Sequence, residues 1–128
     1  MKATELMIGD WVGRVFDDKR IDYRQVDWIR TGEIGMRYQK VWAIGCIEPI
    51  PLTPEILEQN GFIKVNSQRY DYGYPDTDCY VKVNPKKNMI HVNGRNANSN
   101  LYSHSFVHEL QRALRLCGLN ELADNFKI

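Results

Sequence analysis

Two adjacent residues, His108 and Glu109, begin the pattern with which helical zinc peptidases hold their metal. That chemistry needs a second histidine four residues after the first, so that both imidazoles reach one zinc ion while the glutamate acts as a base. Arg112 stands where the second ligand must be. Because a guanidinium carries only donors and binds no metal, the sequence predicts no peptidase centre here.

A second pair of histidines, His104 and His108, does have the spacing of two helical zinc ligands. However, Ser103 and Ser105 flank His104, and serine favours the start of a helix over its interior. No third ligand is evident nearby, so we expect no metal site in this segment.

The segment 105–117 is better explained as an amphipathic helix that packs on a sheet. At about 100° per residue, one face of this helix is apolar. The apolar face consists of Phe106, Val107, Leu110, Ala113, Leu114 and Cys117. The opposite side carries a polar stripe made of His108, Gln111, Arg112 and Arg115. We expect this stripe to be solvated, and we treat it as a candidate interaction surface.

Other patterns that carry chemistry are incomplete in the same way. Asp71, Asp76 and Asp78 are spaced as in part of a calcium loop, but the glycine and the closing glutamate of an EF-hand are missing. Turn formation explains them better. The cysteines and histidines show no local signature of nucleophilic catalysis. The sequence therefore predicts no catalytic, cofactor-binding or metal-binding residue, no cofactor and no enzymatic activity.

Aromatic and basic residues alternate between positions 11 and 42, which is typical of proteins that stack single-stranded bases and contact phosphates. The candidate nucleic-acid face consists of Trp11, Arg24, Trp28, Arg30, Arg37 and Tyr38. Acidic residues are interspersed among them and would repel a phosphate backbone: Asp10, Asp17, Asp18, Asp22 and Asp27. Since half of the residues of a strand face the core, packing of these aromatic residues is the competing interpretation.

Composition limits the classes of protein to which the chain can belong. The 128 residues fit one domain, and 17 basic against 16 acidic residues give a net charge of +1, which provides no global attraction to nucleic acid or to a membrane surface. The three cysteines are far apart and suggest a reducing compartment. Neither a signal peptide nor a membrane-spanning run is evident, so we expect a soluble, cytoplasmic protein without a membrane partner.

The first 52 residues read as short strands joined by tight turns. Extended segments are predicted at 12–16, at 21–29 and at 36–47, where one long strand or a hairpin fits. Their close spacing predicts a small, strongly bent sheet or an SH3-like barrel. Prolines at positions 49 and 51 end this module.

Residues 53–128 are predicted to form an α+β module, which is either separate from the first or part of one compact domain with it. Thr53 and Pro54 begin a short helix that Gly61 ends. Strands are predicted at 62–65, 70–74, 79–83 and 89–92, with a hairpin between the last two, and the polar segment 93–100 is predicted to be a mobile loop. The sheet packs against the helix at 105–117, which a serine caps. That helix ends at Gly118 in the same way as the first ends at Gly61.

Three stretches of the chain together resemble a family of short uncharacterised proteins of Bacteroides-type gut bacteria, their phages and their mobile elements. These stretches are MKATELMIGDWV, PIPLTPEILEQNGF and FVHELQRALRLCGL. The resemblance implies a compact accessory protein and favours binding over catalysis. We therefore expect a non-enzymatic interaction module that binds a protein partner or a second copy of itself. The alternative is a nucleic-acid-binding accessory protein that uses residues 11–42.

Overall fold

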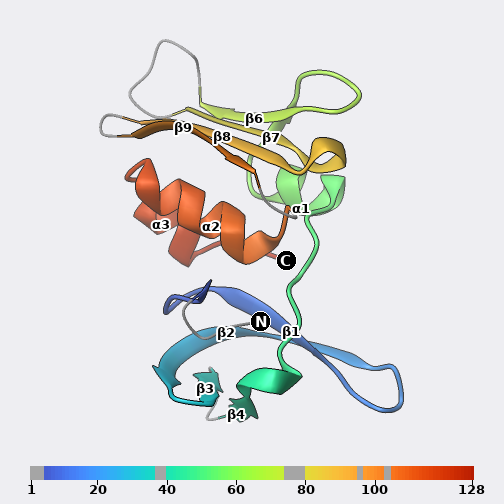
Figure 1. The fold of residues 1–128 in the computed structure, drawn as a ribbon. Helices are drawn as coiled ribbons and strands as arrows, with labels where there is room; N and C mark the ends of the chain where they lie inside the picture. The colour runs from blue at the N-terminus through green and yellow to red at the C-terminus, as the bar shows by residue number, and fades with distance from the viewer. Residues whose placement is uncertain (1–4, 37–39, 74–79, 95–96, 103–104) are drawn as a thin grey trace. The chain divides into compact units, whose positions relative to one another are not determined.

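The computed structural model describes residues 5–36, 40–73, 80–94, 97–102 and 105–128, and it divides the chain into two compact units, Met1–Ile50 and Pro51–Ile128. Each unit contains its own antiparallel sheet, and helices accompany the second sheet (Figure 1). The predicted α+β class is therefore confirmed. Among the described residues, no helix is long and apolar enough to cross a membrane.

The N-terminal unit is a meander of four strands in the order β1-β2-β3-β4. The strands are β1 (Trp11–Val15), β2 (Ile21–Arg30), β3 (Glu33–Met36) and β4 (Lys40–Ala43). The strands predicted at 12–16 and 21–29 are confirmed to within one residue. The segment 36–47 contains the end of β3, the whole of β4 and a 3-10 turn at Ile44–Cys46, so it belongs to a hairpin and is not one long strand.

The chain that follows β4 returns to β1. Gly13 donates its N–H to the carbonyl oxygen of Glu48 over 2.9 Å, and Glu48 donates its N–H to the carbonyl oxygen of Gly13 over 2.7 Å. These two bonds curl the meander around one apolar core. The core consists of Leu6, Val12, Val26, Ile34, Met36, Trp42 and Ile47.

A β-bulge between Val26 and Trp28 shifts the register and changes the direction in which the side chains at the end of β2 point. Beyond the bulge, Trp28 lies directly opposite Gly35 on β3. A β-carbon at position 35 would lie 1.9 Å from the indole ring, so the ring occupies the space that a side chain would need. The guanidinium of Arg30 stacks on the same indole at 4.5 Å from the ring centroid. Gly35 is therefore required by packing at this cross-strand pair.

The C-terminal unit is a five-stranded meander in the order β5-β6-β7-β8-β9, and the long helix α2 lies against β8 (Figure 1). Its elements are α1 (Pro54–Gln59), β5 (Ile63–Lys64), β6 (Tyr70–Gly73), β7 (Tyr80–Asn84), β8 (Met89–Gly94), β9 (Ala97–Tyr102), α2 (Val107–Leu116) and α3 (Asn120–Asp124). The predicted hairpin is confirmed: Val81 pairs with Val92 and Val83 with Ile90, around a 3-10 turn at Pro85–Lys87.

Two predictions for this unit are wrong. The described residues of the polar segment 93–100 are not a loop, because β8 runs to Gly94, β9 begins at Ala97, and the two strands pair antiparallel. Backbone pairing has overridden the turn-forming composition there. The predicted serine cap of the long helix is also absent at Ser105, because Phe106 is the residue before the first turn and Glu109 accepts its N–H over 3.4 Å.

The predicted start and end of α1 and the predicted C-terminal end of α2 are confirmed. The Thr53 hydroxyl caps α1 by accepting the N–H of Ile56 over 3.2 Å. At the other end Gly61 has a φ of 85°, and Phe62 donates to the carbonyl of Leu57 over 3.0 Å. Helix α2 ends in the same way: Gly118 has a φ of 82°, and Leu119 donates to the carbonyl of Leu114 over 2.9 Å.

Asn60 ties the end of the chain to α1. Its Nδ2 atom donates to the carbonyl oxygen of Lys127 over 2.7 Å, and its Oδ1 atom accepts the N–H of Lys127 over 2.8 Å. At the start of the unit, Leu52 donates its N–H to the carbonyl oxygen of Ser105 over 2.9 Å. Both connections join segments that are far apart in the sequence.

We predict that Gly35→Ala destabilises the N-terminal unit by roughly 1–3 kcal/mol, because the new methyl group must displace the Trp28 indole. Gly45 is the matched control, since a β-carbon there meets nothing within 4 Å. Gly45→Ala should change the free energy of unfolding by less than about 0.5 kcal/mol. Urea unfolding followed by tryptophan fluorescence measures both, and equal stability of the two variants would contradict the packing argument.

Candidate functional site

The β1–β2 hairpin places charged side chains on the face of the sheet that the core also uses. In the antiparallel register, Arg14 lies opposite Asp22 and Val12 lies opposite Arg24. Cross-strand partners share a face, and so do residues two apart along a strand. Val12 is fully buried in the core. The charged residues therefore lie on the same face of the sheet as the apolar core, beyond the edge of that core.

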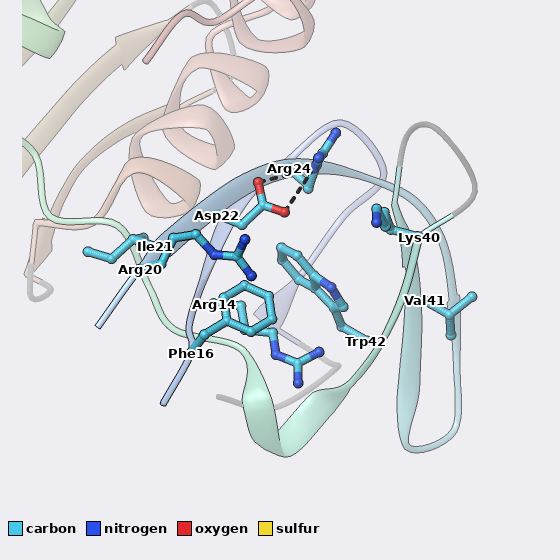
Figure 2. A pocket seen from close by; sticks show the side chains of 9 residues that line it. All are labelled: Arg14, Phe16, Arg20, Ile21, Asp22, Arg24, Lys40, Val41 and Trp42. Carbon is cyan, nitrogen blue, oxygen red and sulfur yellow. Dashed lines mark hydrogen bonds and ion pairs between the residues drawn. The ribbon is translucent and has the colours of Figure 1, made fainter. Parts of the chain in front are cut away.

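This side of the hairpin, together with Ile21 from the other side and with strand β4, lines a groove with a volume of about 520 Å³ (Figure 2). Trp42 lies opposite Ile34 in the register, is only 4% exposed and belongs to both the core and the groove. The groove is lined by Arg14, Phe16, Arg20, Ile21, Asp22, Arg24, Lys40, Val41 and Trp42. It therefore combines a charged lining with an aromatic wall that the core holds in place.

Positive charge dominates the groove. Its lining carries four cations, Arg14, Arg20, Arg24 and Lys40, and one carboxylate, that of Asp22, which leaves an excess of three positive charges (4 − 1). The Nε atom of Arg24 lies 3.2 Å from Oδ1 and 3.3 Å from Oδ2 of Asp22. Among the residues that the structure describes, no carboxylate forms an ion pair with the other three cations.

The Phe16 ring contacts two of these cations. The guanidinium carbons of Arg14 and Arg20 lie 4.7 Å and 4.5 Å from the centroid of the Phe16 ring. A tight turn fixes this arrangement, since Phe16 donates its N–H to the carbonyl of Arg20 over 2.8 Å and Lys19 adopts a φ of 68°. Each cation–π contact contributes about 0.5–1 kcal/mol at an exposed site, which offsets part of the repulsion between the guanidinium groups.

The chemistry of the groove is that of an anion site. Arginine presents a planar fork of N–H donors that matches the oxygens of a phosphate group, and lysine adds a point charge. The lining contains no histidine, cysteine, serine or threonine that would act as a nucleophile or general base. Within the described part of the chain, no three histidine, cysteine or acidic residues gather as a metal site.

Comparisons of the chain with protein-family models, with curated proteins and with solved structures found no match. The resemblance to proteins of Bacteroides-type bacteria therefore stays a prediction. The function has to be argued from the geometry of the groove.

The predicted nucleic-acid face is not a single face of the sheet. Arg24 lies in the groove. Trp11 precedes Val12, the core residue of β1, so the Trp11 side chain points to the face of the sheet opposite the core, here called the outer face. Trp28 and Arg30 point outward as well, because Ile29 between them packs against the core cluster. The other two predicted residues, Arg37 and Tyr38, lie outside the described residues.

Arg24 is the one residue of the predicted nucleic-acid face that lines the groove; the other cations and aromatic residues of the lining were not predicted as part of that face: Arg14, Phe16, Arg20, Lys40 and Trp42. A signal for part of this set exists in the sequence. Once a three-residue turn is placed at 17–19, every second residue from Val12 to Arg24 falls on one face. The contribution of β4 has no such local signal, because it depends on the curl of the sheet.

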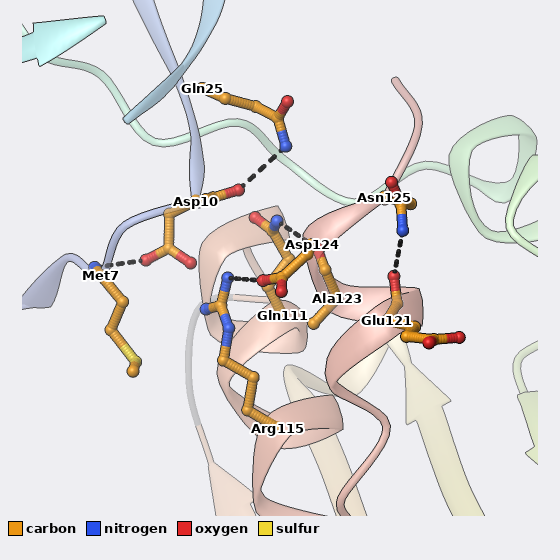
Figure 3. A network of polar contacts seen from close by, with 10 residues as sticks. Met7, Asp10, Gln25, Gln111, Arg115, Glu121, Ala123, Asp124 and Asn125 are labelled. Carbon is orange, nitrogen blue, oxygen red and sulfur yellow. Dashed lines mark hydrogen bonds and ion pairs between the residues drawn. The ribbon is translucent and has the colours of Figure 1, made fainter. Parts of the chain in front are cut away.

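The polar stripe predicted on α2 is not solvated along its length. Gln111 is fully buried, and its Nε2 atom donates to the carbonyl oxygen of Ala123 at 2.9 Å (Figure 3). His108 is 4% exposed, and its ring stacks on Phe106 with 6.0 Å between the centroids. Helical periodicity identified the residues opposite the apolar face, but it did not reveal that α3 would cover Gln111.

The two arginines of the predicted stripe differ from one another. Arg115 is partly buried, and its Nη2 atom lies 3.4 Å from Oδ1 of Asp124 on α3 (Figure 3). Arg112 is exposed. The exposed part of the stripe therefore reduces to Arg112.

A second polar cluster lies on β6 and β7. The Tyr80 hydroxyl donates to Oδ2 of Asp71 over 2.7 Å, and Arg69 contacts the same carboxylate, with Nε 3.1 Å from Oδ1 and Nη2 3.3 Å from Oδ2. Asp71 and Tyr80 are both buried. Burial, followed by the hydrogen bond and the charge of Asp71, raises the pKa of Tyr80 above its ordinary value of 10.0. Oδ2 accepts two hydrogen bonds, whereas Oδ1 has the Arg69 ion pair but no hydrogen bond of good geometry. The Tyr80–Asp71 bond joins β6 to β7 and stabilises their pairing.

We predict that Tyr80→Phe lowers the free energy of unfolding by about 1–3 kcal/mol near neutral pH, because the buried Asp71 carboxylate loses a donor. Since folding raises the pKa of Tyr80, this tyrosine contributes stability that is complete below pH 10 and is lost as the pH rises through the folded pKa. The variant should lose less stability across that alkaline range than the wild type does.

Urea unfolding at neutral and alkaline pH measures both effects. Tyr23→Phe, which removes an exposed hydroxyl, is the control and should change the neutral-pH free energy by less than about 0.5 kcal/mol. If the two variants are equally stable at neutral pH, the Tyr80–Asp71 bond makes no net contribution and this account of the cluster is wrong.

Proposed function

We propose that this chain is a non-enzymatic binding module whose N-terminal groove holds phosphate groups of nucleic acid. One observation carries the proposal: within the described residues, Arg14, Arg20 and Lys40 line one groove without an ion-pairing carboxylate. Such cations attract an anion, and the arginines among them match phosphate in shape.

The position of the cations supports a ligand with repeating charges. They come from separate strands, Arg14 from β1, Arg24 from β2 and Lys40 from β4, so that they contact an anion at several points along the groove. A polymer of phosphates supplies such points, and each one releases counterions when it binds. A partner without negative charge would leave these cations without a counter-charge, so binding of a neutral protein or of a second copy of the chain stays a prediction from the sequence.

The acidic residues that argued against nucleic acid are largely absent from the groove lining. Of these residues, Asp22 alone lines the groove, where Arg24 neutralises it. Asp10 is 1% exposed and accepts the N–H of Met7 over 2.8 Å (Figure 3). Asp17 and Asp18 belong to the exposed turn at the end of the hairpin.

We also propose that the N-terminal unit is an SH3-like barrel, the finer form of the fold predicted from the sequence. The four-stranded meander, the 3-10 turn at Ile44–Cys46 and the return of Glu48 to Gly13 support this topology. In such a barrel the groove lies at an open end of the curled sheet, where charged side chains are accessible to a ligand.

Fluorescence anisotropy with a labelled oligonucleotide, over a series of salt concentrations, tests the groove. The wild-type affinity should fall steeply with added salt. Arg14→Ala and Arg20→Ala should each weaken binding and lower the slope of log K against log salt by about one. Arg30→Ala is the matched control, because Arg30 also stacks on an aromatic ring of the same unit but points away from the groove.

Two outcomes would overturn the proposed function. The first is that no oligonucleotide binds at low salt. The second is binding that salt leaves unchanged, or that Arg30→Ala weakens as much as the two groove variants do. Circular dichroism of each variant verifies that the fold is retained.

A further inference from the structure

Tyr23 lies on the outer face of the β1–β2 hairpin, opposite Gly13 in the register. The tyrosine ring packs over this glycine so closely that a β-carbon at position 13 would lie 3.3 Å from both Cδ1 and Cε1. Tyr23 is nevertheless 44% exposed. The glycine therefore supports one side of the ring and leaves another part of it open to solvent.

Tyr23 differs in this respect from the other aromatic residues that the sheet presents. The Phe16 ring is covered by two guanidinium groups, Trp28 is enclosed by Gly35 and Arg30, and Trp42 is 4% exposed. Among the described residues of the N-terminal unit, Tyr23 is the one aromatic side chain in the exposed class. A planar ligand that approaches this unit therefore finds its open aromatic surface at Tyr23.

One residue of the groove lining, Ile21, belongs to the face of β2 that carries Tyr23. Ile21 stands two residues before Tyr23, shares its face of the strand and also lines the groove (Figure 2). Ile21 and Tyr23, two residues apart, are separated by roughly 7 Å along the strand. In addition, a two-stranded ribbon such as this hairpin twists more strongly than a wide sheet. Ile21 is 50% exposed, and its cross-strand partner Val15 is 48% exposed. An apolar path therefore connects the cationic groove with the tyrosine ring.

We propose that the groove binds single-stranded nucleic acid and that Tyr23 stacks an unpaired base beside the phosphates in the groove. This inference rests on the proposed function. It adds that the nucleic acid is single-stranded and that Tyr23 selects this form. Aromatic rings stack any base, because every base has a π-face, whereas a duplex keeps its bases paired and stacked within the helix. Ile21 and Val15 provide an apolar surface for the edge of the base.

The test uses the full chain, three labelled probes and three variants at position 23. The probes are a single-stranded oligonucleotide, the duplex of the same sequence and an abasic oligomer of equal length, which keeps the phosphates and lacks the bases. Tyr23→Ala removes the ring. Tyr23→Leu keeps an apolar side chain over Gly13 without an aromatic face, and Tyr23→Phe keeps the aromatic face. Ile63→Ala, in the C-terminal unit, is an exposed apolar control.

The wild type should bind the single strand more tightly than the duplex or the abasic oligomer. Tyr23→Ala and Tyr23→Leu should weaken single-strand binding by about 5- to 100-fold, the effect of losing one stacked base, and should leave binding of the abasic oligomer unchanged. Tyr23→Phe and Ile63→Ala should bind all three probes as the wild type does. Thermal unfolding of the variants separates lost stacking from lost folding.

The outcomes distinguish this inference from the proposed function. If the groove arginine variants lose binding while Tyr23→Leu binds the single strand as tightly as the wild type, the groove binds phosphate and the stacking role of Tyr23 is wrong. If the duplex binds as tightly as the single strand, the assigned ligand form is wrong. If no probe binds, the proposed function fails together with the inference. A dimer that Tyr23→Ala abolishes and that oligonucleotides leave intact would assign the apolar path to a second copy of the chain.

Discussion

The register of the β1–β2 hairpin is the constraint on which both faces of the N-terminal unit depend. Because side chains alternate along a strand, a slip of β2 by one residue would place Tyr23 on the face that now holds Asp22 and Arg24. Two sets of backbone bonds oppose such a slip: Glu48 holds Gly13 on one side of β1, and Phe16 bonds to Arg20 across the turn. The placement of side chains on either face thus depends on backbone hydrogen bonds, to which those side chains do not contribute.

Electrostatics in the groove is set by geometry more than by total charge. The whole chain carries only +1, yet an excess of three positive charges lines one groove. The guanidinium groups of Arg14 and Arg20 repel one another, and each contact with the Phe16 ring offsets about 0.5–1 kcal/mol of that cost. Asp22 neutralises Arg24 and limits the field. The groove therefore keeps positive charge concentrated at a modest cost in stability.

Local rules predicted those parts of the fold that local rules control. Thr53, Gly61 and Gly118 stand where cap geometry requires such residues, and alternation located the hairpin of β7 and β8. The failures came from tertiary partners. Polar composition at 93–100 suggested a loop because the sequence does not show that β8 is available to pair with it. The candidate site was predicted in part, since Arg24 and its aromatic and basic neighbours stood out. The sequence alone does not show which of these residues share a face. That depends on the positions of the turn at 17–19 and of the bulge after Val26, which the structure shows.

The clamp between Asn60 and Lys127 has a consequence for the order in which the chain folds during synthesis. The N-terminal unit, Met1–Ile50, contains all the strands of its own sheet, so it completes its hydrogen bonds early. The C-terminal unit joins Leu52 to Ser105 and Asn60 to Lys127, and contacts of such long sequence separation form late because loop closure costs entropy. On the ribosome, the groove-bearing unit is thus expected to fold before Lys127 has been synthesised and can bond to Asn60.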